Sequence, residues 1–220
     1  MITVIDGNKL EKGQQIQVYR NLRKGNFSIR DAKTRRVIAY GTDIILSNIR
    51  MYVQKGGQTA VFWENPNIHP FVEHYMRLQS FIKMAQIYEL PIIKGDIEYG
   101  LNRFLEALNG HFGPERCATC YRLRLEATAK AAKENGFDEI STTLLISPYQ
   151  NHELLQKVGN EAAEKYGVKF HYTDFRPGFR GSHELARKYE LYRQKYCGCI
   201  FSEHDRYKDD KKHYPCLLAD

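Results

Sequence analysis

The chain has 220 residues, of which 42% are hydrophobic and 27% are charged, so it is long enough for one core, or for one core and a small appended module. No stretch approaches the ~20 apolar residues of a membrane helix. The first residues show no basic region followed by an apolar run. This pattern excludes a membrane protein, and we expect a cytoplasmic location. The net charge of +7 lies in residues 1–60, which hold 11 Lys and Arg against 4 Asp and Glu.

Residues 1–57 are predicted to form a small, basic, β-rich module that ends at the linker Lys55-Gly56-Gly57. Alternating residues indicate strands at 15–19 and 26–30, and 37–40 are expected to return antiparallel to the strand before them. Interleaved cations and tyrosines suit a nucleic-acid surface that pairs with phosphates and stacks on bases. They equally suit a solvated basic face over a small core, and the pattern leaves both interpretations open.

Residues 58–202 alternate between strands and helices, which predicts an α/β domain with a parallel sheet. The remaining residues, 203–220, form a charged tail. The predicted strands are 59–63, 90–93, 140–146 and 168–172, and the predicted helices are 71–89, 98–109, 115–134 and 151–166. The first helix carries an apolar stripe of Phe71, Tyr75, Leu78, Ile82 and Ala85.

Five cysteines, in two close pairs and one single residue, favour metal binding or redox chemistry over a disulfide scaffold. Cys117 and Cys120 are three residues apart at the start of a predicted helix, so their sulfurs share one face. The helix N-terminus there, together with Arg116, Arg122 and Arg124, favours thiolates, which bind iron or zinc. This pair alone does not distinguish iron–sulfur, zinc or dithiol chemistry.

Cys197 and Cys199 flank a single glycine, which tolerates the backbone of a small strained ring. Such a pair can alternate between dithiol and disulfide and so take up or release two electrons. Two reduced cysteines packed in a core are the alternative. Cys216 lies alone in the charged tail and is interpreted as incidental.

Two loops follow predicted strands, at the sheet edge where α/β proteins bind ligands. Tyr149, Gln150 and His152 supply donors and acceptors in the first loop, although Pro148 and Asn151 also mark an ordinary helix start. In the second loop, Asp174 suits a metal ligand or proton donor and Arg176 an anion clamp. A surface ion pair between the two explains the same spacing.

Five stretches together resemble one family, the cobalamin-independent epoxyqueuosine reductases. They are 65–70, 115–125, 142–153, 174–180 and 192–202, in the order and spacing of the family. The resemblance implies a Rossmann-like α/β core with flanking helices. It also implies reduction of epoxyqueuosine to queuosine at the wobble position of tRNA, the last step of queuosine biosynthesis. The implied partners are therefore a tRNA carrying epoxyqueuosine and an electron donor.

The resemblance further implies a 4Fe-4S cluster with Cys117 and Cys120 as two ligands, an additional iron ion, and a redox-active disulfide between Cys197 and Cys199. On the same basis, Tyr149 and Asp174 are assigned to catalysis. The residues assigned to substrate binding are Asn67, His69, Gln150 and Arg176.

The chain departs from the family before Asn65, where members carry a Cys-Cys-x-x-Cys run with the other two cluster ligands. No cysteine precedes Cys117 here, so another cysteine or a partner chain supplies the ligands, or the cluster is absent. Reduction of epoxyqueuosine remains the leading prediction. The alternatives are a catalytically incomplete tRNA-binding relative and a structural zinc protein whose ligands are Cys117, Cys120, Cys197 and Cys199.

Overall fold

A computed structural model describes residues 59–209 without a break. Before them it describes residues 2–4, 16–21, 26–31, 34 and 37–41, for which the strand pairing is given. The predicted linker at 55–57, Cys216 and the last residues of the charged tail lie outside the described residues. None of the described helices is long and apolar enough to cross a membrane.

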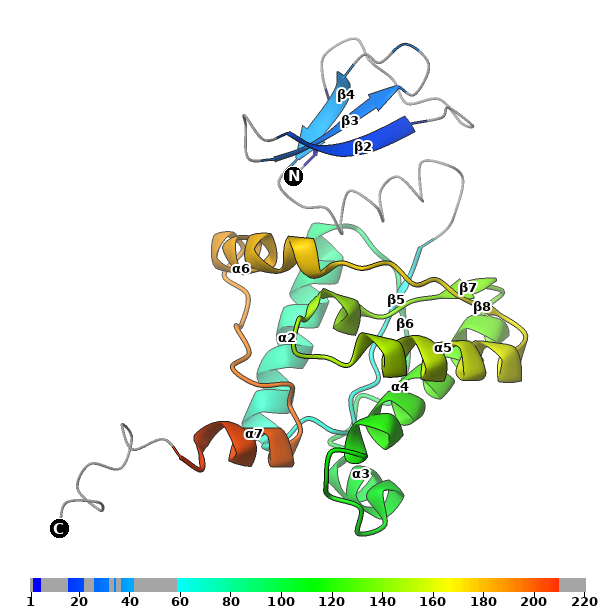
Figure 1. Ribbon diagram of the computed structural model, residues 1–220, viewed down its shortest axis with the longest axis vertical. Coiled ribbons are helices and arrows are strands. Elements are labelled where there is room, and N and C mark those ends of the chain that lie inside the picture. Colours follow the sequence, from blue (N-terminus) through cyan, green and yellow to red (C-terminus); the bar gives the residue numbers. More distant parts are fainter. Residues whose placement is uncertain are drawn as a thin grey trace, which may run out of the picture.

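The N-terminal strands form an antiparallel sheet in the order β1-β4-β3-β2 (Figure 1). Strand β3 pairs with both β2 and β4, and the register shifts between Ile29 and Arg30. These three strands lie where the alternation predicts them, whereas β1 was not expected. That residues 1–57 form a separate basic module stays a prediction. The bounds are β1 Ile2–Val4, β2 Ile16–Asn21, β3 Asn26–Asp31 and β4 Val37–Gly41.

Residues 59–209 contain two parallel two-stranded sheets. Strand β5 (Val61–Phe62) pairs with β6 (Ile92–Ile93), and β7 (Glu139–Ile140) pairs with β8 (Lys169–Phe170). Each connection contains a helix, α2 (Phe71–Ile87) in the first and α5 (His152–Tyr166) in the second. The α/β class with parallel strands is therefore confirmed, whereas a Rossmann-like sheet stays a prediction.

The predicted strand 140–146 ends after Ile140, so the prediction is wrong for the rest of that run. The Thr142 hydroxyl accepts a hydrogen bond from the Leu144 amide at 3.3 Å and caps a 3₁₀ helix, η1 (Thr143–Ile146). The Ser141 hydroxyl donates to the His171 carbonyl at 2.9 Å. The Thr142 bond is local, and local bonds of this kind compete with strand pairing.

The main core lies between α4 (Arg116–Glu134) and α5, with Tyr121, Leu125 and Leu155 among its buried side chains. The predicted ends of these helices are confirmed. The Asn151 side chain accepts from the Leu154 amide at 3.0 Å and starts α5, and Gly167 ends it at a φ of +68°. Helix caps of this kind depend only on neighbouring residues, so they can be predicted from the sequence.

The predicted apolar stripe of α2 is wrong in its first turns. Phe71 and Tyr75 are 58% and 49% exposed, whereas Glu73 and His74 are buried. Glu73 pairs with Arg77 at 2.6 Å and accepts a hydrogen bond from the Tyr192 hydroxyl. This polar network fixes the inward face of the helix and leaves the two aromatic rings on the surface.

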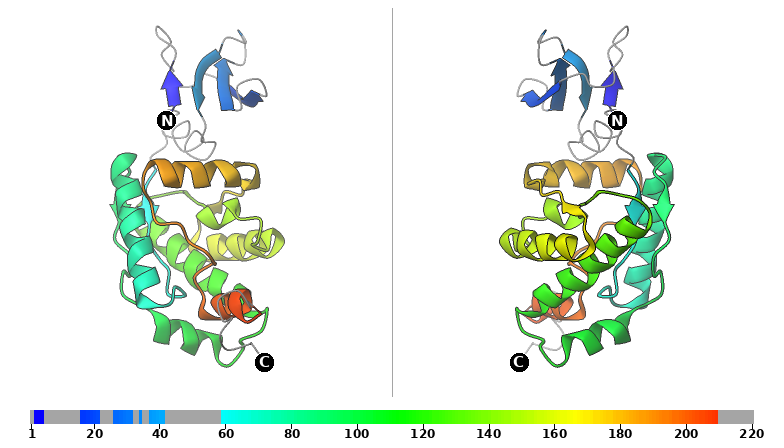
Figure 2. Two further views of the ribbon diagram at one scale, coloured as in Figure 1. Left: turned by 90° about the vertical axis from the view of Figure 1, so that its left-hand side faces the viewer. Right: turned by 90° about the vertical axis from the view of Figure 1, so that its right-hand side faces the viewer.

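The remaining helices are α3 (Leu101–Leu108), α6 (Phe179–Lys188) and α7 (Ile200–Tyr207), with a 3₁₀ turn, η2 (Arg176–Gly178), before α6. Neither α6 nor α7 was predicted. Between them, the 189–199 segment runs alongside α2 (Figures 1 and 2). Its Tyr192 amide donates to the Ser80 hydroxyl at 2.8 Å, and Tyr189 contacts Tyr88 edge to face. This packing brings the second cysteine pair to the start of α2.

Candidate functional site: a pocket with two cysteine pairs

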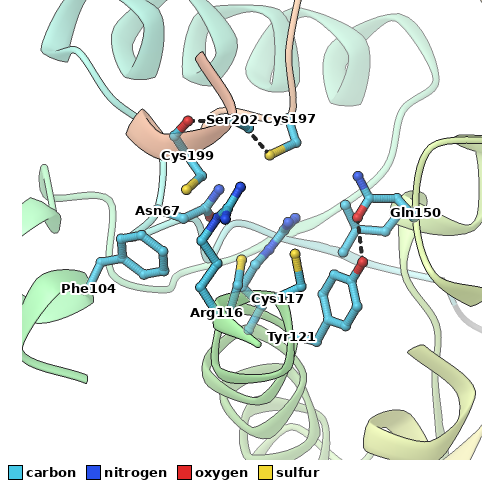
Figure 3. A pocket seen from close by; sticks show the side chains of 12 residues that line it. Asn67, Phe104, Arg116, Cys117, Tyr121, Gln150, Cys197, Cys199 and Ser202 are labelled. Carbon is cyan, nitrogen blue, oxygen red and sulfur yellow. Dashed lines mark hydrogen bonds between the residues drawn. The ribbon is translucent and has the colours of Figure 1, made fainter. Parts of the chain in front are cut away.

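One pocket collects residues that lie far apart in the sequence (Figure 3). Its volume is about 50 Å³, which admits a few water molecules or the reacting end of a larger ligand. Both cysteine pairs reach it, one from the first turns of α4 and one from the loop before α7. Asn67 enters from the loop after β5 and Gln150 from the loop before α5. These predicted site residues are Cys117, Cys120, Cys197, Cys199, Asn67 and Gln150.

The loop that carries Cys197 and Cys199 is held by hydrogen bonds to backbone carbonyl groups. The His69 amide donates to the Gly198 carbonyl at 2.8 Å, and the Tyr196 hydroxyl donates to the His69 carbonyl at 2.5 Å. The Arg77 guanidinium donates to the carbonyls of Tyr196 and Cys197, both at 2.9 Å. The start of α2 thus fixes the second cysteine pair against the pocket.

Gly198 is required at the centre of this loop for two reasons. Its φ of +112° is a backbone conformation that side chains rarely tolerate. A Cβ there would also lie 2.9 Å from Ile68 Cγ1 and 3.0 Å from Arg77 Nη1. The predicted need for glycine between the cysteines is therefore explained by both conformation and space.

The four described cysteines are unbonded thiols with different exposure. Cys197 is exposed, and its Sγ donates to the Ser202 hydroxyl at 2.9 Å, whereas Cys199 is only 4% exposed. Ser202 in turn donates to the Cys199 carbonyl at 2.7 Å. One sulfur of the pair therefore faces solvent and the other faces the protein interior.

Burial favours the thiol form of the cysteines in this pocket. It raises the pKa of Cys117 and of Cys199, and it raises the pKa of Cys120 to about 12. Arg116 and Arg124 lower the pKa of Cys117 and Cys120 respectively, but by less than burial raises it. Burial therefore opposes the predicted preference for thiolates, which stays a prediction. A bound metal cation would reverse the balance.

The third arginine of this run does not contribute to the pocket. Arg122 points to α5, where it pairs with Glu161 at 3.7 Å on the surface. Arg116 lines the pocket and pairs with Asp205 of α7 at 2.7 Å. This ion pair ties the start of α4 to the helix that follows the second cysteine pair.

The described residues do not, as placed, form a site for a 4Fe-4S cluster. Such clusters are held by three or four cysteines, and α4 supplies two. Among residues 59–209 no group of three His, Cys, Asp or Glu side chains is close enough to hold one metal ion. The same geometry gives no support to a four-sulfur zinc site.

Two amide side chains offer free hydrogen-bonding groups to the pocket. Asn67 is 2% exposed, and its Oδ1 has no partner among the described residues. The Tyr121 hydroxyl donates to Gln150 Oε1 at 2.7 Å and accepts from the Asn151 amide at 3.4 Å, so the Gln150 NH₂ group is left for a ligand (Figure 3). The pocket therefore presents an acceptor and a donor beside the sulfurs.

Asp174 and Arg176 are absent from the pocket lining and form a two-armed ion pair on the surface, with distances of 2.7 and 2.8 Å. The hydrogen bond from Arg176 lowers the pKa of Asp174 to about 2. The ionised form of Asp174 is thus favoured, and its predicted catalytic role stays a prediction.

Two further predicted site residues also lie outside the pocket lining. Tyr149 is 85% exposed and contacts Phe179 edge to face. The His69 ring is bonded to the Tyr99 hydroxyl, while its backbone holds the cysteine loop. Each of them is next in sequence or bonded to a residue of the pocket, Tyr149 to Gln150 and His69 to Gly198 of the cysteine loop.

Several residues that position the pocket were not predicted from the sequence. Arg77, Tyr121 and Ser202 act on residues from 3 to 120 positions away, and spacing does not reveal such contacts. Tyr121 and Ser202 lie inside the stretches that carry the family resemblance, which was the only signal available for them. Glu64 was marked by no sequence motif. Its carboxylate accepts a hydrogen bond from Arg103 at 2.6 Å, and its carbonyl accepts one from Arg124 at 3.2 Å.

The fold and the site define an α/β protein in which two cysteine pairs from separate elements share one small pocket. A family model described as epoxyqueuosine reductase QueH matches residues 43–205. The chain belongs to this family. The match starts ahead of residue 65, where the first of the five resembling stretches begins.

Curated relatives agree with this assignment. An epoxyqueuosine reductase QueH from Dehalococcoides mccartyi is 32% identical over 160 residues, which cover 73% of this chain and 87% of the relative. The protein of the same name from Thermotoga maritima is 35% identical over 148 residues, covering 64% and 77%. The one from Acinetobacter baylyi is 35% identical over 154 residues, covering 66% and 69%.

Proposed function

We propose that this chain reduces epoxyqueuosine to queuosine in tRNA, the reaction after which its relatives are named. The observation that carries the proposal is the shared pocket, in which two cysteine pairs meet the free Asn67 oxygen and the Gln150 amide. We also infer a cytoplasmic location, which suits a tRNA-modifying enzyme and a set of free thiols.

The dithiol of Cys197 and Cys199 balances the reaction. Conversion of an epoxide to an alkene, with its oxygen leaving as water, consumes two electrons and two protons. Oxidation of two thiols to one disulfide releases the same number of each. The stoichiometry is thus epoxyqueuosine plus dithiol to queuosine, water and disulfide. The exposed Cys197 is the sulfur that an external electron donor can reach to restore the dithiol.

The other assigned residues have binding roles in this proposal. Asn67 accepts a hydrogen bond from the modified base, and Gln150 donates one. Tyr149, His69 and the ion pair of Asp174 with Arg176 surround the entrance and contact the nucleotide. Cys117 and Cys120 supply two thiolates to a cluster only if further ligands come from outside the described residues, as Cys216 or a partner chain would provide.

A single-turnover experiment tests the dithiol reaction. The protein is reduced, freed of reductant without oxygen, and mixed with tRNA that contains epoxyqueuosine. We expect one queuosine per chain and the loss of two titratable thiols. Cys197→Ser should abolish both. Product formed without loss of thiols would remove the dithiol from the reaction.

Metal content tests the cofactor separately. Iron, acid-labile sulfide and zinc are measured per chain after anaerobic purification. About four iron and four sulfide would place a cluster on ligands beyond the described residues. One zinc without sulfide, together with no turnover, would instead favour the structural zinc protein. Salt-sensitive tRNA binding without turnover would favour the catalytically incomplete tRNA-binding relative.

A further inference from the structure

Two aromatic side chains lie on the surface at the start of α2. Phe71 is 58% exposed and Tyr75 is 49% exposed, and the neighbouring Val72 and Met76 are also exposed. They continue into a groove between α2 and the 189–199 segment, lined in part by Met76 and Tyr192. Contiguous exposed apolar surface of this kind is typical of binding sites.

The rings are held in place by other aromatic residues. Phe71 and Tyr75 have centroids 6.3 Å apart and planes inclined by 24°, so they present similar faces. Tyr99 meets Phe71 edge to face at 5.7 Å and is itself bonded to the His69 ring. A ligand that stacks here therefore meets rings already packed against their neighbours.

A short segment, residues 67–71, links this aromatic surface to the cysteine pocket. His69, two residues before Phe71, bonds Gly198 through its backbone amide at 2.8 Å. Asn67, two residues earlier again, lines the pocket itself. The same segment therefore carries a residue of the pocket and the first of the two exposed rings.

Two positively charged side chains precede the second cysteine pair in the sequence. Arg193 and Lys195 are exposed in the 189–199 segment, shortly before Cys197. Neither takes part in an ion pair with any residue of 59–209, in contrast to Arg77 and Arg116. These cations lie in the segment that packs along α2, the helix that carries the exposed rings. Cations and exposed aromatic rings match the two chemical features of single-stranded RNA, its phosphates and its base faces.

We propose that Phe71 and Tyr75 stack on a nucleobase of the anticodon loop next to the modified base, while Arg193 and Lys195 bind the adjoining phosphates. The proposal rests on the proposed function for its choice of RNA. It commits to single-stranded RNA as the occupant, rather than to a second copy of this chain or to residues 1–57.

The test uses full-length variants and a fluorescent anticodon stem-loop RNA. Phe71→Leu with Tyr75→Leu keeps the apolar surface and removes the rings, whereas Phe71→Tyr keeps a ring. We expect the paired leucine variant to raise Kd for the RNA, and KM for an epoxyqueuosine stem-loop, by about tenfold or more. The value of kcat should stay within about twofold. Ile92→Thr, an exposed apolar residue on β6, serves as the matched control and should change nothing.

A second arm measures the dependence of Kd on salt. Replacing Arg193 and Lys195 by Gln should make the slope of log Kd against log salt shallower by about 1.4. Unchanged Kd in the leucine variant would overturn the stacking role, as would a change in oligomeric state or a loss of binding that Phe71→Tyr shares. Because the binding arm needs no turnover, it decides this proposal even if wild-type protein fails to reduce the stem-loop.

Discussion

Replacing Arg77 by Met should release the loop that carries Cys197 and Cys199. Arg77 donates to two carbonyls of that loop at 2.9 Å and pairs with Glu73 at 2.6 Å, with both side chains 9% exposed. Removing one partner of a buried ion pair costs about 3–5 kcal/mol, because the other charge is left uncompensated. For a chain of this size, the loss corresponds to a fall in Tm of about 6–20 °C.

Thermal and urea unfolding of four proteins measure this effect. Adding Glu73→Gln to Arg77→Met removes the uncompensated charge, so the double variant should be more stable than Arg77→Met alone. Arg122→Met is the matched control, since the exposed pair of Arg122 with Glu161 contributes less than about 1 kcal/mol. A loss below about 1 kcal/mol in Arg77→Met, or a double variant no more stable than that single variant, would refute the reasoning.

Two further substitutions test how the core and the pocket are built. Gly159→Ala should destabilise the protein by about 1–2 kcal/mol in urea unfolding, although alanine ordinarily favours a helix by about 1 kcal/mol. The reason is that its Cβ would lie 2.6 Å from the Phe170 ring. Adding Phe170→Leu should restore stability. A Gly159→Ala variant that is more stable than the wild type would contradict this packing. Tyr121→Phe removes the donor that orients Gln150. We expect KM for the tRNA to rise about threefold to tenfold, with kcat and Tm little changed, and an unchanged KM would show that Gln150 needs no such support.

The sequence by itself determined the features that depend on neighbouring residues. The paired cysteines, the glycine between Cys197 and Cys199 and the caps at Asn151 and Gly167 follow from spacing and local backbone preference. The alternation of strands and helices gave the α/β class with parallel pairs. The five collinear motifs predicted the family, and the matching family model confirms it.

Only the tertiary structure decided which side chains face inward and how far burial acts on the thiols. Phe71 and Tyr75 of α2 face solvent, whereas Glu73 and Arg77 form a buried ion pair on the same helix. Hydrophobicity alone placed the two rings in the core. Burial raises the pKa of Cys120 by more than the nearby Arg124 lowers it. Both outcomes depend on groups brought together from distant parts of the chain, and desolvation and pairing at such contacts are not encoded in local spacing.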